Sequence, residues 1–230
     1  MLERVPETEV MDVWEDAVEY DSMDFTGVNG AFAQRSLELG PPSGLMLDCG
    51  TATARIPILI LQQNINFQIT GIDLSGNMLK IGEANIVDAD LRGAISLHCI
   101  DAKELPFPNN HFDMVISNSL LHHLSIPISF LKEANRVIKP NGGILIRDLI
   151  RPKDRKGVDL LVDRHTGDSS DRQRKLFQES LLSSFTLKEV EELLTLSGIH
   201  GARVVQSSDR HWSIERKWYK EMKKDFSLSL

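Results

Sequence analysis

Long runs of apolar residues are absent from this sequence, which excludes a membrane-spanning helix of about 18 or more such residues. Residues 1–20 are acidic and hold no apolar core, so we expect no secretory signal peptide. Cysteine is scarce: Cys49 and Cys99 lack the spacing of a metal site, and we expect both to be small buried residues. These absences predict a cytoplasmic protein that keeps its thiols reduced.

Positive charge is also in short supply. There are 26 Lys and Arg against 33 Asp and Glu, which gives a net charge of −7. Because an acidic chain repels phosphate backbones, we expect no nucleic-acid partner. The 230 residues, of which 41% are hydrophobic, are enough for an α/β domain with an ample core. The sequence leaves the oligomeric state open.

Residues 45–73 read as strand, tight turn, helix and strand. The first apolar run ends at Asp48 and Gly50, a helical pattern follows Thr53, and a second apolar run closes on Asp73. An acid about 20 residues after a glycine turn is where a Rossmann-type βαβ unit meets a ribose hydroxyl. The rest of the chain extends a sheet around this unit.

The remaining periodicity predicts alternating helices and strands. We expect helices at 8–20, 29–39, after Ser75, at 127–138 and at 187–197, and further strands at 94–100, 111–118, 144–149, 202–206 and 210–218. The last two strands are close in sequence and predict a hairpin, hence one antiparallel strand. The alternation predicts an α/β fold with an otherwise parallel sheet.

Two segments fall outside this rhythm. Residues 1–44 form an N-terminal helical appendage, either packed on the sheet or acting as a lid with Tyr20, Met23 and Phe25 facing a ligand. The main domain is then 45–230. Within it, 150–183 is a charged insertion that we expect near the substrate site.

Four separated motifs carry a family resemblance: LMLDCGTATA from residue 45, GIDLSGNML from 71, CIDAKELPFPNNHFDMVISNSLLHHL from 99 and LKEANRVIKPNGGILIRDL from 131. Together they resemble the class I methyltransferases that depend on S-adenosyl-L-methionine (SAM). The resemblance is greatest to the small-molecule branch that includes the ubiquinone and menaquinone C-methyltransferases. It implies a three-layer Rossmann-like sandwich with a seven-stranded, mostly parallel sheet whose last strand is antiparallel.

The resemblance also implies a cofactor site for SAM and its product S-adenosyl-L-homocysteine (SAH). Asp48 and the Gly50 backbone would hold the amino-acid end, Asp73 the ribose hydroxyls, and Asp101 the adenine amino group. The full set implied is Asp48, Gly50, Thr51, Ala52, Asp73, Leu74, Met78, Asp101, Ala102 and Asn118. The first motif departs from the family pattern, because Ala52 and Ala54 replace glycines; if position 52 needs a positive φ, alanine costs about 1 kcal/mol.

Methyl transfer is an in-line displacement that also needs removal of any proton from the nucleophile. The candidate catalytic residues are His122, His123, Asp148 and His165. Adjacent residues point different ways, so we expect at most one of the paired histidines to face the site, and we expect no metal. Candidates for an anionic substrate, or else solvated surface residues, are Arg147, Arg151 and Arg164. We interpret Arg210, His211 and Trp212 as packing residues of the last strand.

The leading hypothesis is a SAM-dependent methyltransferase acting on a small molecule. The replaced glycines motivate an alternative, a module that binds SAM or SAH without catalysis or serves as a partner subunit. A nicotinamide-dependent Rossmann enzyme is a second alternative, which residues 106–124 and the predicted terminal hairpin disfavour. The acceptor atom remains open.

Overall fold

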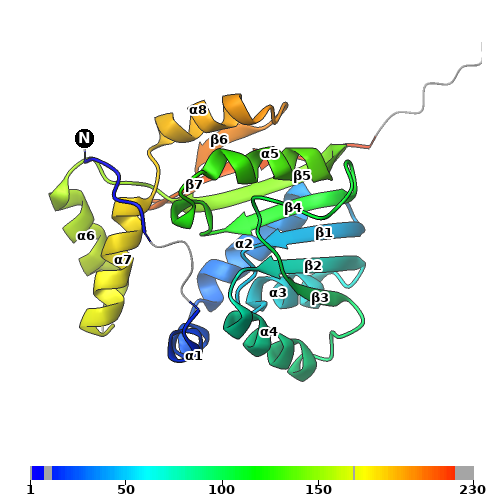
Figure 1. Ribbon diagram of the computed structural model, residues 1–230, viewed down its shortest axis with the longest axis horizontal. Helices are drawn as coiled ribbons and strands as arrows, with labels where there is room; N and C mark the ends of the chain where they lie inside the picture. The colour runs from blue at the N-terminus through cyan, green and yellow to red at the C-terminus, as the bar shows by residue number, and fades with distance from the viewer. Residues whose placement is uncertain (1, 8–11, 168, 221–230) are drawn as a thin grey trace, which may run out of the picture.

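The computed structural model describes residues 2–7, 12–167 and 169–220. A seven-stranded sheet runs through the centre in the order β3-β2-β1-β4-β5-β7-β6 (Figure 1). The strands are β1 (Gly44–Cys49), β2 (Phe67–Asp73), β3 (Ile95–Cys99), β4 (Phe112–Asn118), β5 (Ile138–Leu149), β6 (Arg203–Gln206) and β7 (His211–Arg216). The last strand, β7, pairs antiparallel with β5 and β6, and the other pairs are parallel. The predicted sheet is therefore confirmed.

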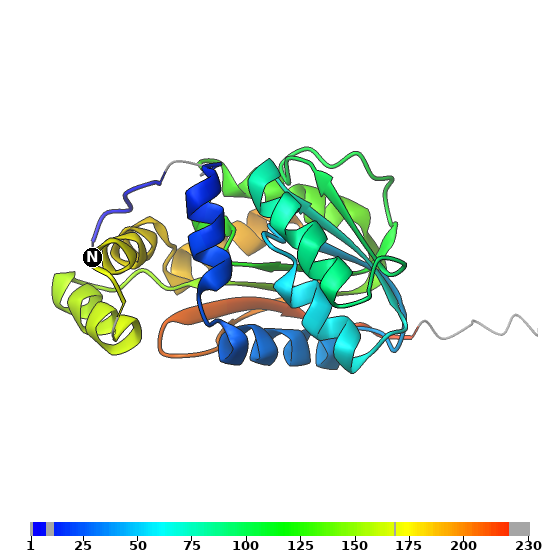
Figure 2. The same ribbon diagram turned by 90° about the horizontal axis from the view of Figure 1, so that it is seen from below.

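Helices cover both faces of this sheet, which makes three layers (Figures 1 and 2). One face carries α2 (Thr26–Leu39), α3 (Arg55–Gln63) and α4 (Gly76–Asp88), and the other carries α5 (Pro127–Val137) and α8 (Leu187–Ser197). The central strands are buried on both faces, as their unbroken apolar sequence predicts. Ser75 accepts a hydrogen bond from the Met78 amide, and Thr186 forms a capping box with Glu189, so both predicted helix starts are confirmed.

The register brings several strand ends to one level. Cys49 lies opposite Ile72 of β2 and opposite Ser117 of β4. The residues that follow Cys49, Ile72 and Ser117 in the sequence are Gly50, Asp73 and Asn118. The turn after β1, the acid at the end of β2 and the amide at the end of β4 therefore meet at the carboxyl edge of the sheet, where open α/β folds bind ligands.

Three boundaries differ from the sequence prediction. The first helix, α1, spans Trp14–Ser22, while the predicted start at residues 8–11 lies outside the described residues. The second helix begins at Thr26, whose amide bonds to Asp24, rather than at residue 29. Residues 139–143, where we expected a turn, are part of β5. Phe112 of β4 pairs with Ile138 and Met114 pairs with Gly143, so the extra residues of β5 form an irregularity within the strand pair.

Residues 150–183 fold as two helices, α6 (Arg155–Thr166) and α7 (Asp171–Ser183), that pack on each other beyond the carboxyl ends of the strands (Figure 1). Their small apolar cluster joins Val158, Val162 and Leu181 to Leu149 at the end of β5. Only three residues of α6 and two of α7 are buried, and some of these are polar, which explains why the sequence periodicity of both helices is weak.

The N-terminal residues 2–7, which we call the strap, run along this helix pair. The Leu2 amide bonds to the Lys153 carbonyl, and the Val5 amide bonds to the Leu182 carbonyl. Arg4 donates to the carbonyls of Ser183 (2.5 Å) and His122 (2.9 Å). The strap therefore links the start of the chain to the insertion and to the segment after β4.

Two further points concern the sequence predictions. Cys49 is buried as expected, but Cys99 is exposed because β3 is an edge strand of the sheet. Among the described residues, every helix is too short or too polar to cross a membrane.

Candidate functional site

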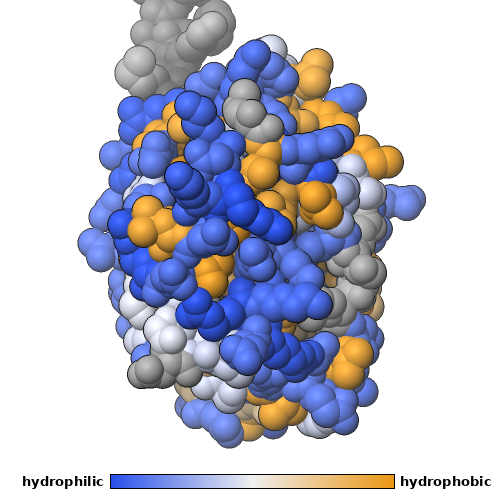
Figure 3. Space-filling view, turned by 90° about the vertical axis from the view of Figure 1, so that its left-hand side faces the viewer, coloured by the Kyte–Doolittle hydropathy of each residue, from blue (hydrophilic) through white to orange (hydrophobic). Residues whose placement is uncertain are grey.

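A cavity of about 820 Å³ opens at the carboxyl edge of the sheet. Its walls come from the strand ends, the α1–α2 corner, the segment after β4, the helix pair α6–α7 and the start of β7. The outer surface at the end of the molecule that carries α6 and α7 is mainly hydrophilic, with small hydrophobic patches (Figure 3). Tyr20, Met23 and Phe25, the residues expected to face a ligand from a lid, line the cavity.

The turn after β1 keeps the shape of a glycine loop although two of its glycines are replaced. Gly50 has φ +74°, and the amides of Gly50 and Thr51 both donate to the Ile72 carbonyl at 2.9 Å. Ala52 (φ 47°) and Ala54 (φ 61°) adopt left-handed conformations that glycine reaches without strain. The sequence-based condition that position 52 needs a positive φ is thus met, and the loop tolerates the strain.

Asp73 lies at the centre of this loop. Its Oδ2 accepts from the Ala52 amide and its Oδ1 from the Ser75 amide, both at 2.9 Å. Burial raises the pKa of Asp73, and these backbone bonds partly oppose that change. Each carboxylate oxygen can accept a further hydrogen bond. Asp73 lines the cavity, so its carboxylate can receive two hydroxyl donors of a diol.

A second carboxylate follows the next strand. Asp101 lines the cavity and accepts from the Lys103 amide at 2.8 Å, with the Lys103 ammonium 3.3 Å from its other oxygen. Leu74, Met78 and Ala102 add apolar surface between the two acids. This combination fits an adenosine: acceptors for a ribose diol and an exocyclic amine, with apolar faces for the base.

Two of the predicted cofactor residues do not line the cavity. Asp48 is 1% exposed and Thr51 is 6% exposed, because the loop turns them under itself. Burial raises the pKa of Asp48 to about 7. The Asp48 side chain, which we expected to hold the amino-acid end of the cofactor, therefore does not line the cavity, whereas Gly50 and Ala52 of the loop and Asn118 of β4 do.

His122, which lines the cavity, and Asp148 form a buried pair. His122 lies in the 3₁₀ turn η1 (Leu121–His123), and its Nδ1 is 2.6 Å from Asp148 Oδ1. Its backbone amide donates to Asp148 Oδ2 at 2.9 Å, and the Leu149 amide donates to Oδ1 at 2.6 Å. Asp148 is fully buried and does not line the cavity, so it orients His122 rather than touching a ligand.

Each member of this pair changes the pKa of the other. Burial alone would lower the pKa of His122, but the Asp148 carboxylate raises it above the ordinary value. Burial would raise the pKa of Asp148, but the bonds to His122 and the Leu149 amide keep it below the ordinary value. Because Nδ1 faces Asp148, Nε2 is the ring nitrogen of His122 that remains for a ligand in the cavity.

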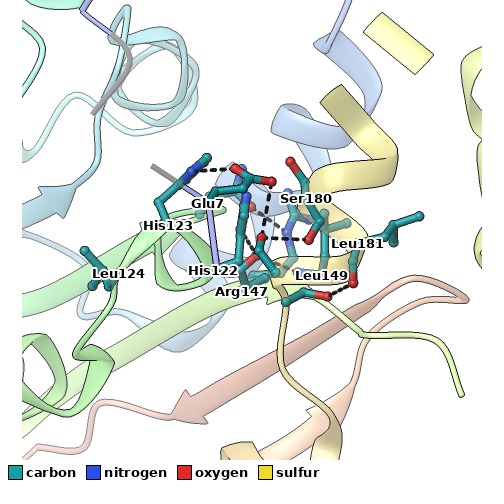
Figure 4. Close-up of polar contacts among 12 residues, drawn as sticks. Glu7, His122, His123, Leu124, Arg147, Leu149, Ser180 and Leu181 are labelled. Atoms are coloured by element: carbon teal, nitrogen blue, oxygen red, sulfur yellow. Dashed lines mark hydrogen bonds and ion pairs between the residues drawn. The ribbon is translucent and has the colours of Figure 1, made fainter. Parts of the chain in front are cut away.

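His123 also lines the cavity, which corrects the expectation that at most one of the two histidines would. The tight turn sets the two rings 4.0 Å apart, and Glu7 of the strap lies 3.0 Å from His123 Nδ1 (Figure 4). Glu7, His122 and His123 bring potential ligand atoms within 4.8 Å of one another, so they could hold a divalent cation. No sequence pattern links Glu7 to this site, because the strap docks through tertiary contacts.

The fourth catalytic candidate, His165, lines the cavity from α6, and its Nε2 lies 2.9 Å from Asp209. Of the arginines considered for an anion, Arg151 pairs with Glu189 and Arg164 with Asp209. The packing interpretation holds for Trp212, which is fully buried, but not for Arg210 and His211, which line the cavity.

Comparison with known proteins agrees with this architecture. Residues 47–146 match the family model described as a methyltransferase domain. A demethylmenaquinone methyltransferase of Listeria monocytogenes (serotype 4a, strain HCC23) is 36% identical over 104 residues, which are 45% of this chain and 43% of the relative. The chain therefore spans less than half of that relative's length.

Two solved structures share the fold. A candidate S-adenosyl-L-methionine-dependent methyltransferase of Methanococcus maripaludis gives a TM-score of 0.71 at 20% identity, covering 94% of this chain and 99% of the other. A SAM-dependent methyltransferase from Aquifex aeolicus gives 0.66 at 19% identity, covering 88% and 97%.

Proposed function

We propose that the chain is a class I SAM-dependent methyltransferase, which transfers a methyl group from SAM to a small molecule held in the cavity; the match of residues 47–146 to a methyltransferase domain and the shared fold support this proposal. The observation that carries this proposal is the joint placement of Asp73, Asp101 and His122 on the wall of one cavity. When bound, SAM would supply a methyl group on a sulfonium as the electrophile, and the thioether SAH would be the leaving group.

The chain's own residues divide into two halves for this reaction. The cofactor half has Asp73 for the ribose, Asp101 and the Ala102 backbone for the adenine, and Leu74 and Met78 for apolar contact. The Gly50–Ala52 backbone and Asn118 serve the amino-acid end. Burial in the cavity excludes water from the reacting atoms, which strengthens each of these polar contacts.

His122 is the base that we propose for the acceptor. Its Nε2 accepts the proton that the nucleophile loses, and Asp148 holds the ring and stabilises the resulting imidazolium. His123 and His165 also pair one ring nitrogen with a carboxylate, but we prefer His122 because its pair with Asp148 is buried, whereas the pairs with Glu7 and Asp209 are partly exposed to water, which weakens them.

A module that binds the cofactor without catalysis is the second candidate. Its support is the pair of alanines at positions 52 and 54, each in a left-handed conformation that costs about 1 kcal/mol. SAM turnover with any acceptor would exclude this candidate.

The first experiment is isothermal titration of the protein with SAM, SAH and NAD in parallel. We expect micromolar binding of SAM and SAH, its loss in Asp73→Ala, and its retention in Asp88→Ala, which removes an exposed acid at the far end of α4. Binding of NAD alone would overturn the proposed function, and SAM binding that survives Asp73→Ala would overturn the assigned site.

A further inference from the structure

Two arginines, Arg147 and Arg210, lie beside β5 and β7 at this side of the cavity, and neither forms an ion pair within the described residues. Arg210 lines the cavity and is partly buried, and its guanidinium lies 5.9 Å from the centre of the Phe177 ring. Within the described part of the chain, this guanidinium makes no hydrogen bond or ion pair. Such a group in a cavity is a ready donor of paired hydrogen bonds to a carboxylate or phosphate.

Arg147, on the neighbouring strand, adds a second cation with only neutral partners. Its Nε donates to Asn118 Oδ1 at 2.9 Å and its Nη2 to the Val28 carbonyl at 3.2 Å, and it lies over the Phe32 ring. Burial and the charge of Arg210 lower the pKa of Arg147 to about 10, although the charge of Asp148 partly opposes that change. The two guanidinium groups are therefore near enough to repel each other.

The nearby carboxylates are already engaged. Asp209 binds Arg164 and His165, and Asp148 binds His122. Burial and the charges of Arg147 and Arg210 lower the pKa of His211 to about 3, against the opposing charges of Asp148 and Asp209, so its ring adds no positive charge at neutral pH. Partly buried cations without a counter-ion are costly to a fold, and a bound anion would remove that cost.

The surroundings of Arg210 define the rest of the ligand. Leu176 and Phe177 of α7, Leu149 at the end of β5, and Val28 of α2 line the cavity with apolar surface. Phe177 also restrains the arginine side chain by a cation–π contact. A molecule with one anionic group and an apolar body matches this wall.

We propose that the methyl acceptor is an apolar small molecule bearing a carboxylate or phosphate, which Arg210 binds directly and Arg147 attracts from behind. This inference rests on the proposed function and names its substrate class. The cofactor's own carboxylate is a less suitable ligand for Arg210, because the strand that follows it, β7, lies two strands from Asn118 of β4 and three from the loop after β1, roughly 10 and 14 Å at the usual strand spacing. The loop after β1 serves the cofactor.

Titration of the SAH-loaded protein with benzoate, phenyl phosphate and the uncharged benzamide tests this proposal. We expect the two anions to bind about tenfold more tightly than benzamide, as one charge-assisted contact provides. Arg210→Gln should abolish that preference and Arg210→Lys should retain part of it. Arg92→Gln, which removes an exposed arginine near β3, should leave it unchanged.

Two readings separate failure of this proposal from failure of the proposed function. Equal binding of benzoate and benzamide to the wild type would overturn the anionic acceptor, even if SAH binds normally. If Arg210→Gln weakens SAH binding as much as it weakens anion binding, the arginine belongs to the cofactor site, and the proposal of an anionic acceptor is overturned as well. If SAH itself does not bind, the same three probes on the unloaded protein still decide whether the wall prefers anions.

Discussion

His122 is anchored by Asp148 through both its ring and its backbone, and this sets the pH at which it can act. The carboxylate raises the pKa of His122, and a base must be neutral, so kcat/KM should rise with pH through a value above the ordinary 6.5 or so. Asp148→Asn removes the negative charge while burial remains, so the pKa of His122 should fall.

The variant should therefore move the rising limb of the pH profile to lower pH. It should also lower the maximal rate, by about tenfold or more, because the amide no longer stabilises the imidazolium. SAH affinity, measured alongside, should not change. A profile that keeps its position in Asp148→Asn would show that another group is the base.

Gly50 is the one glycine of the first motif that the chain retains, and its geometry explains why. Its φ is +74°, and an added Cβ would lie 3.2 Å from the Leu120 side chain, which also lines the cavity. We expect Gly50→Ala to destabilise the fold by about 1–2 kcal/mol and to weaken SAH binding. Ala52→Gly should be nearly neutral, because relief of strain and the greater freedom of the unfolded chain offset each other. Thermal unfolding and titration with SAH measure both effects, and tolerance of Gly50→Ala would contradict this account.

Glu7, His122 and His123 offer one carboxylate and two imidazoles, ligands that Zn²⁺ accepts, with Asp148 as the outer partner of His122. Because Zn²⁺ would occupy the Nε2 of His122, we expect added Zn²⁺ to inhibit methyl transfer and a chelator to restore it. His123→Ala should need more Zn²⁺ for the same inhibition. Activity that disappears on chelation and returns with metal would instead make this cluster part of the catalytic site.

Gly142 and Gly143 allow β5 to continue through residues 139–143, where the sequence predicts a turn. A Cβ on Gly143 would lie 2.5 Å from Met114 Sδ and 2.9 Å from the Leu39 carbonyl. Gly143→Ala should therefore lower the free energy of unfolding by about 1–3 kcal/mol in urea titrations. Gly93→Ala is the control, because an added Cβ there meets nothing within 4 Å. Equal stability of the two variants would show that the strand shifts to make room.

Elements with strong periodicity were predictable, and those made by tertiary contact were not. The strands around Asp48 and Asp73 follow from apolar runs and a glycine turn, and α8 follows from its capping box. The expected turn at 139–143 became strand because β4 supplies partners that local sequence does not reveal. The strap has no periodicity of its own, so Glu7 could not be placed beside His123 in advance.

At the level of the whole molecule, too, features set by local sequence were predictable and features set by tertiary contacts were not. Parallel alternation of helices and strands predicts the sheet, and the strand ends predict where Asp73, Asp101 and Asn118 line the cavity. The acceptor half depends on how α6, α7 and β7 assemble, so sequence reasoning considered Arg164, which Asp209 neutralises, and passed over Arg210. The proposed cofactor site is therefore local to strand ends, whereas the proposed acceptor site combines segments that are distant in the sequence.

The docking of the strap has a practical consequence for handling this protein. Glu7 lines the cavity and Arg4 bonds to the carbonyl of His122, so anything fused ahead of residue 2 is tethered a few residues from the reaction centre. The segment after β7 lies away from the cavity: Arg216 at the end of β7 pairs with Ile144, far from the carboxyl end of β5, and the Trp218 amide bonds to the Leu39 carbonyl. Affinity handles and immobilisation linkers are therefore best attached at the C-terminal side, where they leave the entrance of the cavity free.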